Sequence, residues 1–136
     1  MEVAIGRKYK LTTSDNFDDY MKFIGVGYLS RKAAGSVSPV FTLSKNEDGS
    51  WTILFTSVIR NVSITFHLDQ EFEEERADGT KVQSKYFLED GKLHNIQIEK
   101  NGRKSRHIRE ITPEKVILTT TCDGWNGKCV RVYELI

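Results

Sequence analysis

The chain has 136 residues, and its 20 Lys and Arg against 19 Asp and Glu give a formal net charge of +1. This length suits one domain with a packed core and is small for two, so we expect one domain over residues 1–136. The balanced charge creates no global field that would favour nucleic acid or an acidic substrate, and any electropositive feature must therefore be local.

The N-terminal segment, residues 1–8, lacks the apolar run of a secretory signal, and no window of the chain is apolar for long enough to span a bilayer. We therefore expect a cytoplasmic protein, with the nucleus left open as a second compartment. In a reducing compartment Cys122 and Cys129 are expected to be free thiols. A disulfide between them is the alternative, because a hairpin would place them across from each other.

The first predicted element is a strand over residues 7–12, and a helical region follows it. Ser14 or Asp15 can cap a helix that begins near Asn16, and Gly25 can end it. The apolar face of this helix has helical spacing and consists of Phe17, Tyr20, Met21 and Ile24.

A second short helix is predicted over residues 28–34, where a glycine and then a proline follow it. From residue 40 onward, strand-like runs alternate with turns rich in Gly, Asn and Asp. These runs cover residues 40–45, 51–58, 63–68, 70–75, 81–88, 93–100, 103–110, 116–122 and 129–135. Short strands joined by such turns predict an up-and-down antiparallel barrel of ten strands.

Polar residues recur in these strands, and whichever face points inward encloses several of them. Asn95, Gln97 and Thr120 are examples. Buried polar groups need partners, and ordered water in a ligand cavity can supply them. The pattern therefore predicts a barrel with a solvated cavity rather than a solid core.

Two predicted strands carry arginines that share a face with other functional groups. Because side chains alternate along a strand, Arg131 shares a face with Tyr133, and Arg109 shares one with His107. If these faces point into the barrel, two guanidinium groups and a phenol are enclosed with no obvious carboxylate to neutralise them. A guanidinium offers a planar fork of donors that fits a carboxylate, and it cannot shed its charge. The arrangement therefore predicts an anionic ligand.

The opposite orientation of the last strand is an alternative. Val130, Val132 and Ile136 form an apolar face, which an ordinary sheet would turn inward, leaving Arg131 in solvent. His107 also has two interpretations. It adds a donor or a pH-sensitive charge to the cavity, or it is a neutral histidine satisfied by a neighbour.

Short motifs along most of the chain recur in one known family. The opening consists of Gly6-Arg7-Lys8-Tyr9-Lys10-Leu11, Asn16-Phe17-Asp18-Asp19-Tyr20-Met21-Lys22 and Gly25-Val26-Gly27. Downstream follow Arg31-Lys32, Pro39, Phe66, Glu71-Phe72-Glu73-Glu74, Asp78-Gly79, Lys81-Val82, Gly91-Lys92-Leu93, Arg109-Glu110 and Arg131-Val132-Tyr133. In their order and spacing these motifs resemble the intracellular lipid-binding proteins, the family of fatty-acid-binding and cellular retinoid-binding proteins.

The resemblance implies an all-β fold of the calycin type, a ten-stranded antiparallel up-and-down β-barrel with a helix-turn-helix lid over about residues 15–36. It also implies that Arg131 and Tyr133 bind the ligand carboxylate directly, while Arg109 acts through water. Retinol-binding members carry glutamine at the matching arginine positions. The two arginines therefore favour an acid, either a fatty acid or retinoic acid.

By the same resemblance, further side chains would line the lid and the cavity. They are Phe17, Tyr20, Met21, Val26, Ser30, Ala34, Pro39, Phe55, Ile59, Ala77 and Asp78. An ordinary core role is the alternative for the apolar lid residues among them. Lys22, Arg31 and Lys32 would form a basic patch on the lid that meets anionic membranes, with a solvated helix face as the alternative.

We expect a monomeric carrier that binds a long-chain fatty acid reversibly and delivers it between membranes and enzymes. The alternatives are a retinoic-acid carrier and a membrane-associating structural protein of the peripheral myelin type. No cofactor, metal or catalytic activity is expected, because the histidines are isolated and no nucleophile motif is present. The acidic run that includes Glu73 and Glu74 is interpreted as a solvated strand, and Trp125 as an exposed residue at a hairpin tip.

Overall fold

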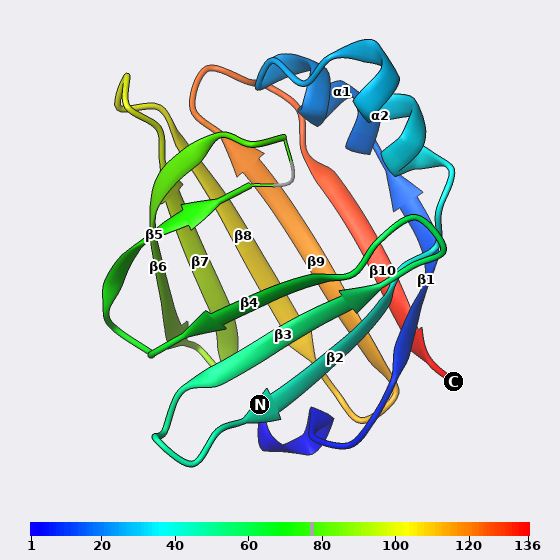
Figure 1. Cartoon of the computed structure of the whole chain (residues 1–136), viewed down its shortest axis with the longest axis vertical. Coiled ribbons are helices and arrows are strands. Elements are labelled where there is room, and N and C mark those ends of the chain that lie inside the picture. The colour runs from blue at the N-terminus through cyan, green and yellow to red at the C-terminus, as the bar shows by residue number, and fades with distance from the viewer. Residues whose placement is uncertain (77) are drawn as a thin grey trace.

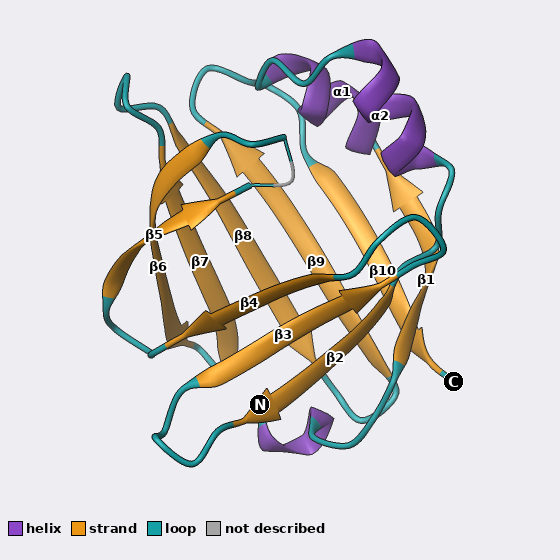
Figure 2. Ribbon diagram, viewed as in Figure 1, coloured by secondary structure: helices purple, strands orange, loops and turns teal. Residues whose placement is uncertain are grey.

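The computed structural model describes residues 1–76 and 78–136. A ten-stranded antiparallel sheet curves into a barrel, with two helices across one end and a short 3₁₀ helix, Glu2–Ala4, at the other (Figure 1). The helices are α1, Phe17–Phe23, and α2, Tyr28–Gly35. The strands are β1 Tyr9–Asp15, β2 Val40–Lys45, β3 Trp51–Thr56, β4 Val62–Phe66, β5 Glu71–Glu75, β6 Lys81–Glu89, β7 Lys92–Ile98, β8 Lys104–Ile111, β9 Lys115–Cys122 and β10 Cys129–Leu135 (Figure 2). The predicted barrel with a helical lid is confirmed.

The sheet follows the chain in space, with one long-range closure. Its strand order is β4-β3-β2-β1-β10-β9-β8-β7-β6-β5, so the pairing of β1 with β10 joins the two ends of the chain. β4 and β5 stand at the two ends of this order, and the described residues give them no pairing with each other. Aromatic rings fill this seam, because Phe66 of β4 stacks on Tyr86 of β6 with ring centroids 4.0 Å apart.

Strand alternation decides which side chains of β10 enter the barrel. Arg131 and Tyr133 are buried, whereas Val130 and Val132 on the other face are only half-buried. The register places Arg131 opposite the buried Leu118 of β9. A slip by one residue would turn every buried side chain of β10 outward, so the inward neighbours fix this register together. The arginine face, and not the valine face, therefore points inward.

The apolar core lies against the inner face of β1 to β4. Its members on these strands are at most 4% exposed and are Tyr9, Phe41, Leu43, Trp51, Ile53 and Phe66. The same cluster extends to Tyr86, Leu93, Val116 and Tyr133 on the other side of the barrel. Full burial of one such side chain contributes about 1.5–3 kcal/mol to folding. This wall is therefore a main source of the stability of the barrel.

The junction of β1 and α1 differs from the prediction. β1 continues to Asp15 instead of ending near residue 12, because Ser14 and Asp15 stay paired with β10 beyond a bulge. Asn16 then turns the chain with a φ of 62°, and α1 begins at Phe17 without a side-chain cap. The predicted capping role of Ser14 or Asp15 is therefore wrong. No helix in the described part of the chain has the length and apolar character needed to cross a membrane.

The hairpin between β9 and β10 lies against the lid (Figure 1). The prediction of an exposed Trp125 is wrong, since its ring is half-buried. The ring centroid lies 5.7 Å from that of Tyr20 and 6.4 Å from that of Phe23, both in α1. The long hairpin thus supplies an aromatic contact that holds α1 over the barrel.

Candidate ligand-binding site

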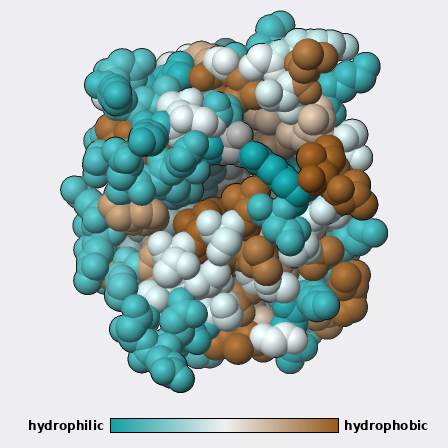
Figure 3. Space-filling view, viewed as in Figure 1, coloured by the Kyte–Doolittle hydropathy of each residue, from teal (hydrophilic) through white to brown (hydrophobic). Residues whose placement is uncertain are grey.

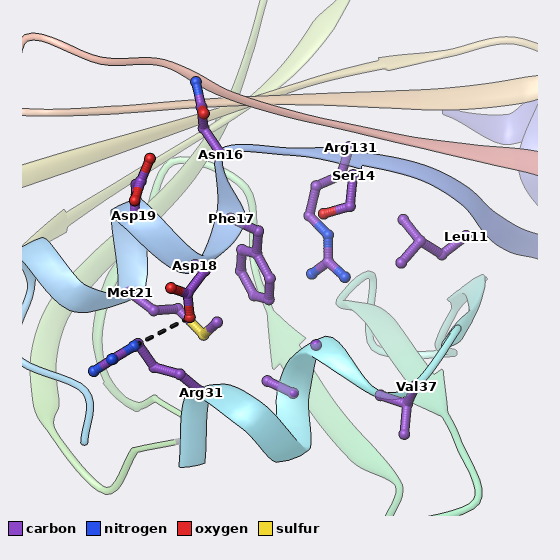
Figure 4. A pocket seen from close by; sticks show the side chains of 12 residues that line it. Leu11, Ser14, Asn16, Phe17, Asp18, Asp19, Met21, Arg31, Val37 and Arg131 are labelled. Carbon is purple, nitrogen blue, oxygen red and sulfur yellow. Dashed lines mark hydrogen bonds and ion pairs between the residues drawn. The ribbon is translucent and has the colours of Figure 1, made fainter. Parts of the chain in front are cut away.

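A cavity of about 410 Å³ lies between the two helices and the adjoining ends of β1 and β10 (Figure 4). It is lined by Leu11, Ser14, Asn16, Phe17, Asp18, Asp19, Met21, Arg31, Ala34, Gly35, Val37 and Arg131. Ligand cavities commonly have volumes of roughly 300–1,000 Å³. The cavity is therefore large enough for a small lipid head group and part of its chain.

Arg131 points into this cavity from β10 (Figure 4). Its side chain is 8% exposed, and its Cζ atom lies 3.8 Å from the centre of the Phe17 ring in α1. Among the described residues, no acceptor lies within hydrogen-bonding distance of its Nε. The guanidinium group is thus held by a cation–π contact with the lid and keeps a donor available.

Arg109 and Tyr133 lie on the same inner surface. Arg109 is 7% exposed, and its Nη1 has no acceptor in the described part of the chain. Burial raises the pKa of the Tyr133 phenol, while the positive charges of Arg131 and Arg109 oppose that rise. The phenol therefore stays a neutral donor at physiological pH.

Glu74 of β5 is the functional candidate that the sequence interpretation missed. It is 8% exposed, and it accepts hydrogen bonds from Ser84 Oγ at 2.8 Å and from Gln97 Nε2 at 3.4 Å. Burial raises the pKa of its carboxyl group, while the hydrogen bond from Ser84 and the charge of Arg109 oppose the rise. The expectations of a solvated strand at this residue and of arginines enclosed without a carboxylate are therefore wrong.

The signal for Glu74 was the alternation within β5. Phe72 and Glu74 share the inner face of this strand, whereas its other three glutamates are exposed. The run of glutamates hid the difference between the buried Glu74 and its exposed neighbours, because composition alone does not separate the two faces of a strand.

The hydrogen bonds of Glu74 belong to a larger network on the inner face of β6 to β9. Asn95 donates to Ser84 Oγ at 2.7 Å, and Gln97 donates to Asn95 Oδ1 at 3.0 Å. His107 contacts Gln97 Oε1 through Nε2 at 3.4 Å and Thr120 Oγ1 through Nδ1 at 2.8 Å. These side chains form one polar wall, which accounts for the polar residues noted in the sequence.

His107 is neutral in this wall. Burial lowers its pKa to about 3, and the positive charges of Arg109 and Arg76 act in the same direction. Because Gln97 Oε1 can only accept, Nε2 of the neutral ring must donate to it, and Nδ1 accepts from Thr120. The structure therefore favours the satisfied, uncharged histidine.

A cluster of charges ties α1 to the mouth of the barrel. Arg76 lies 3.6 Å from Glu99 and 3.8 Å from Asp78, and Glu99 also binds Arg103 through contacts of 2.6 and 2.9 Å. Arg103 donates to two backbone carbonyls at the C-terminal end of α1, both at 3.4 Å. We call Arg76, Glu99 and Arg103 the α1 clasp.

The structure brings some of the predicted lining residues together and separates others. Phe17, Met21 and Ala34 meet Arg131 at the cavity. Tyr20 is buried, with its hydroxyl donating to Ser105 at 2.9 Å. Val26, Pro39 and Phe55 are half-buried, Ser30 and Ile59 are exposed, Asp78 is paired with Arg76, and Ala77 lies outside the described residues.

The predicted basic patch on the lid is divided. Lys22 and Lys32 are exposed. The side chain of Arg31 is 15% exposed and donates to Asp18 at 3.1 Å and to the Val26 carbonyl at 2.7 Å. The two lysines are therefore the members of the patch that are open to an anionic surface.

The two cysteines do not line this cavity. Cys122 and Cys129 are free and buried, so the prediction of free thiols is confirmed. Burial raises the pKa of the Cys129 thiol to about 11, which keeps it protonated. The described residues contain no cluster of His, Cys, Asp and Glu side chains that could hold a metal ion.

Comparison with known proteins gives the family. A sequence profile of the lipocalin / cytosolic fatty-acid binding protein family matches residues 6–134. A fatty acid-binding protein of Tyrophagus putrescentiae is 40% identical over 133 residues, which cover 97% of this chain and 98% of that protein.

Solved structures are similar over almost the whole chain. The fatty acid-binding protein in brain tissue of Drosophila melanogaster is 40% identical with a TM-score of 0.87, over 96% of this chain and 98% of that one. A Schistosoma mansoni fatty acid binding protein in complex with arachidonic acid is 29% identical with a TM-score of 0.89, over 100% of this chain and 98% of that one. The chain therefore belongs to the lipocalin / cytosolic fatty-acid binding protein family.

Proposed function

We propose that this protein binds a long-chain fatty acid reversibly inside its barrel and carries it between membranes and enzymes. Arg131 and Tyr133 hold the carboxylate directly in this proposal, and Arg109 contributes through water. The observation that carries it is the burial of two guanidinium groups whose charge the one buried carboxylate among the described residues, Glu74, does not balance. The relatives named above, one of them in complex with arachidonic acid, support the same ligand class.

Burial of the acyl chain would dominate the affinity. Each buried methylene contributes roughly 0.8 kcal/mol, so a long chain contributes on the order of ten kcal/mol before the cost of ordering it. An aromatic surface next to the proposed carboxylate site suits such a chain, because the ring of Phe55 lies 5.7 Å from Phe41 and 6.2 Å from Tyr133. The arginines would then set orientation and head-group choice.

A displacement assay tests this function. Delipidated protein is loaded with a fluorescent fatty-acid analogue and titrated with oleate, retinoic acid and retinol. We expect oleate to displace the analogue. Arg131→Gln should lower the affinity for oleate about tenfold, since a hydrogen bond to a charged group contributes roughly 1.5–3 kcal/mol. Arg106→Gln is the matched control, because Arg106 lies on the outer face of β8 and pairs with Asp123 on the surface.

Each other outcome of that assay has a defined meaning. Preference for retinoic acid over oleate would assign the protein to the retinoid carriers. Retinol, which lacks a carboxylate, should bind without dependence on Arg131. No binding of the analogue at all would contradict the cavity function.

We also propose that the lid makes transient contact with anionic membranes through Lys22 and Lys32. Exposed apolar side chains are also present, since Leu29 of α2 is 80% exposed and Val58 at the β3–β4 turn is 97% exposed. Hydrophobic atoms gather at this turn in the space-filling view (Figure 3). A basic residue near an anionic surface contributes about 1 kcal/mol, which is adequate for transient contact.

Transfer of the fluorescent analogue to phosphatidylserine vesicles tests this contact. The double variant Lys22→Glu/Lys32→Glu should transfer more slowly, whereas Lys115→Glu, an exposed change at the far end of β9, should not. High salt should remove the difference. Equal transfer rates would contradict the proposed contact, and vesicle binding that persists after Arg131→Gln without fatty-acid binding would favour a membrane-associating structural protein.

A further inference from the structure

Glu74 is a buried acidic side chain that the proposed carboxylate site does not use. It stands on the inner face of β5, opposite Val82 of β6. The charge of Arg109 is close enough to act on its carboxyl group, and Ser84 and Gln97 donate to its two oxygens. Glu74 therefore lies within the electrostatic reach of Arg109, on the inner face of the same barrel that buries Arg131.

The hydrogen bonds around Glu74 are directed toward its oxygens. The Gln97 amide donates both to Asn95 Oδ1 and to Glu74 Oε2, and the Asn95 amide donates to Ser84 Oγ. The Ser84 hydroxyl hydrogen is then directed to Glu74 Oε1 at 2.8 Å. Both carboxyl oxygens act as acceptors, which is the pattern of an ionised carboxylate. The network thus holds a negative charge in the barrel despite the cost of burying it.

The interior charges sum to one positive charge. Arg109 and Arg131 are both more than nine-tenths buried, and Glu74 offsets one of them. His107 is neutral, since its pKa is lowered to about 3. Arg76 does not change this sum, because Arg76 and Arg103 together balance the two acidic side chains that they contact, Asp78 and Glu99.

We propose that Glu74 determines the charge of the head group, so that the barrel accepts lipids with one negative charge and discriminates against those with two. This inference rests on the proposed function. A monoanion at Arg131 neutralises the interior, whereas a dianion leaves one negative charge without a partner in a low-dielectric enclosure that already contains a carboxylate. An uncompensated charge is costly in such a place, and its repulsion by Glu74 is weakly screened.

Two lipids with the same chain and similar tetrahedral heads separate charge from shape. At pH 8.5 hexadecyl sulfate carries one negative charge, and hexadecyl phosphate carries two, since the second pKa of a phosphate monoester is about 6. Below their micellar concentrations, we expect the sulfate to bind about tenfold more tightly. This preference should shrink as the pH falls to about 5, where the phosphate carries one charge. Equal affinities at pH 8.5 would overturn the inference.

The variant Glu74→Gln tests whether Glu74 is the residue that causes the preference for the singly charged lipid. It should abolish or reverse the preference for the sulfate, because the interior then holds two positive charges, which a dianion neutralises. Glu73→Gln is the matched control, since Glu73 is the exposed neighbour on the same strand and pairs with Lys81 at 3.8 Å. It should keep the full preference. A preference that Glu74→Gln leaves unchanged would contradict the role of Glu74.

The ratio of two ligands within one protein protects the test from folding defects. Partial loss of stability in Glu74→Gln lowers both affinities and leaves their ratio unchanged. If that variant does not fold, the pH series with the unsubstituted protein still decides the charge preference. Palmitate is included in every series, so that a failure of the proposed carrier function can be distinguished from a failure of the proposed role of Glu74. Failure to bind palmitate, sulfate and phosphate contradicts the proposed carrier function, whereas tight binding of all three without charge preference contradicts only the role of Glu74.

Discussion

The two walls of this barrel follow the same strand alternation but enclose opposite chemistry. β1 to β4 turn aromatic rings and branched aliphatic side chains inward. β5 to β9 also bury apolar side chains such as Leu93 and Val116, but among them they turn inward the polar groups of Glu74, Ser84, Asn95, Gln97 and Thr120. The apolar wall is stabilised by the exclusion of water, which needs no particular partner. The polar wall is stable only while each group keeps its hydrogen bonds. One wall therefore serves stability and, in the proposed function, would contact the acyl chain, and the other fixes where charge can lie.

The largest effect on stability is expected from a cavity in the apolar wall. Ile53 of β3 is 0% exposed, so Ile53→Ala removes buried methyl groups and leaves a void. We expect the free energy of unfolding to fall by about 3 kcal/mol. Leu88→Ala is the control, because Leu88 is 49% exposed and its truncation should cost less than about 1 kcal/mol. Urea unfolding of delipidated protein measures both, and equal losses would contradict the assignment of the core to this wall.

A break in the polar wall should cost somewhat less. Asn95 is 1% exposed and bonds to Ser84, Gln97 and the Lys85 carbonyl. Asn95→Leu keeps a similar volume but leaves buried groups without partners, so we expect the free energy of unfolding to fall by about 2 kcal/mol. A comparable amide-to-leucine change on the outer face, Gln83→Leu, should have little effect. If the two variants unfold at the same urea concentration, the polar wall does not depend on its bonds.

The neutral histidine makes the polar wall sensitive to acid. His107 has a pKa lowered to about 3, so below pH 6.5 the unfolded chain binds a proton at this residue that the folded chain does not. Stability is therefore lost as the pH falls from 6.5 towards 3, by about 1 kcal/mol at pH 5.5.

Comparison with His107→Gln isolates this effect, because glutamine does not titrate. Between pH 7.5 and 5.5 the unsubstituted protein should lose stability relative to this variant. The nearby groups Arg109, Arg76 and Glu74 are present in both proteins, and the raised pKa of Glu74 acts in the opposite direction in both. Parallel stability profiles would show that His107 is protonated in the folded protein or is not buried.

The sequence was sufficient for the barrel and for the shared strand face of Arg131 and Tyr133 because these depend on local patterns. Strand alternation and glycine-rich turns can each be recognised within a few residues. The alternation over β10 places Arg131 and Tyr133 on one face. Choosing that face over Val130 and Val132 needed the resemblance to a family, since alternation alone fits both orientations. The structure decides it through the register with β9.

The features that the sequence concealed depend on contacts between distant segments. Asn16, and not a capping side chain, starts α1, because β10 holds the preceding residues in β1. Trp125 is covered because the hairpin folds against α1. Alternation within β5 groups Glu74 with Phe72, but only the position of that strand in the barrel shows that this face is the inner one. Long-range pairing, which periodicity does not report, decides each of these.

The smallest effect on stability is expected at the α1 clasp, which joins the ends of β5, β7 and β8 to the lid. Arg103 is partly exposed, and its bonds to the end of α1 are 3.4 Å long, so Arg103→Met should change the free energy of unfolding by less than about 1 kcal/mol. Those bonds nevertheless join α1 to the mouth of the barrel, and their loss should let the lid open more often. We expect the fluorescent fatty-acid analogue to dissociate about threefold faster in stopped-flow measurements. Arg106→Met, which removes a surface ion pair from β8, the strand that follows Arg103, should leave the rate unchanged. If dissociation is equally slow in both variants, the ligand does not leave past the end of α1, and the cavity beneath α2 becomes the route to examine.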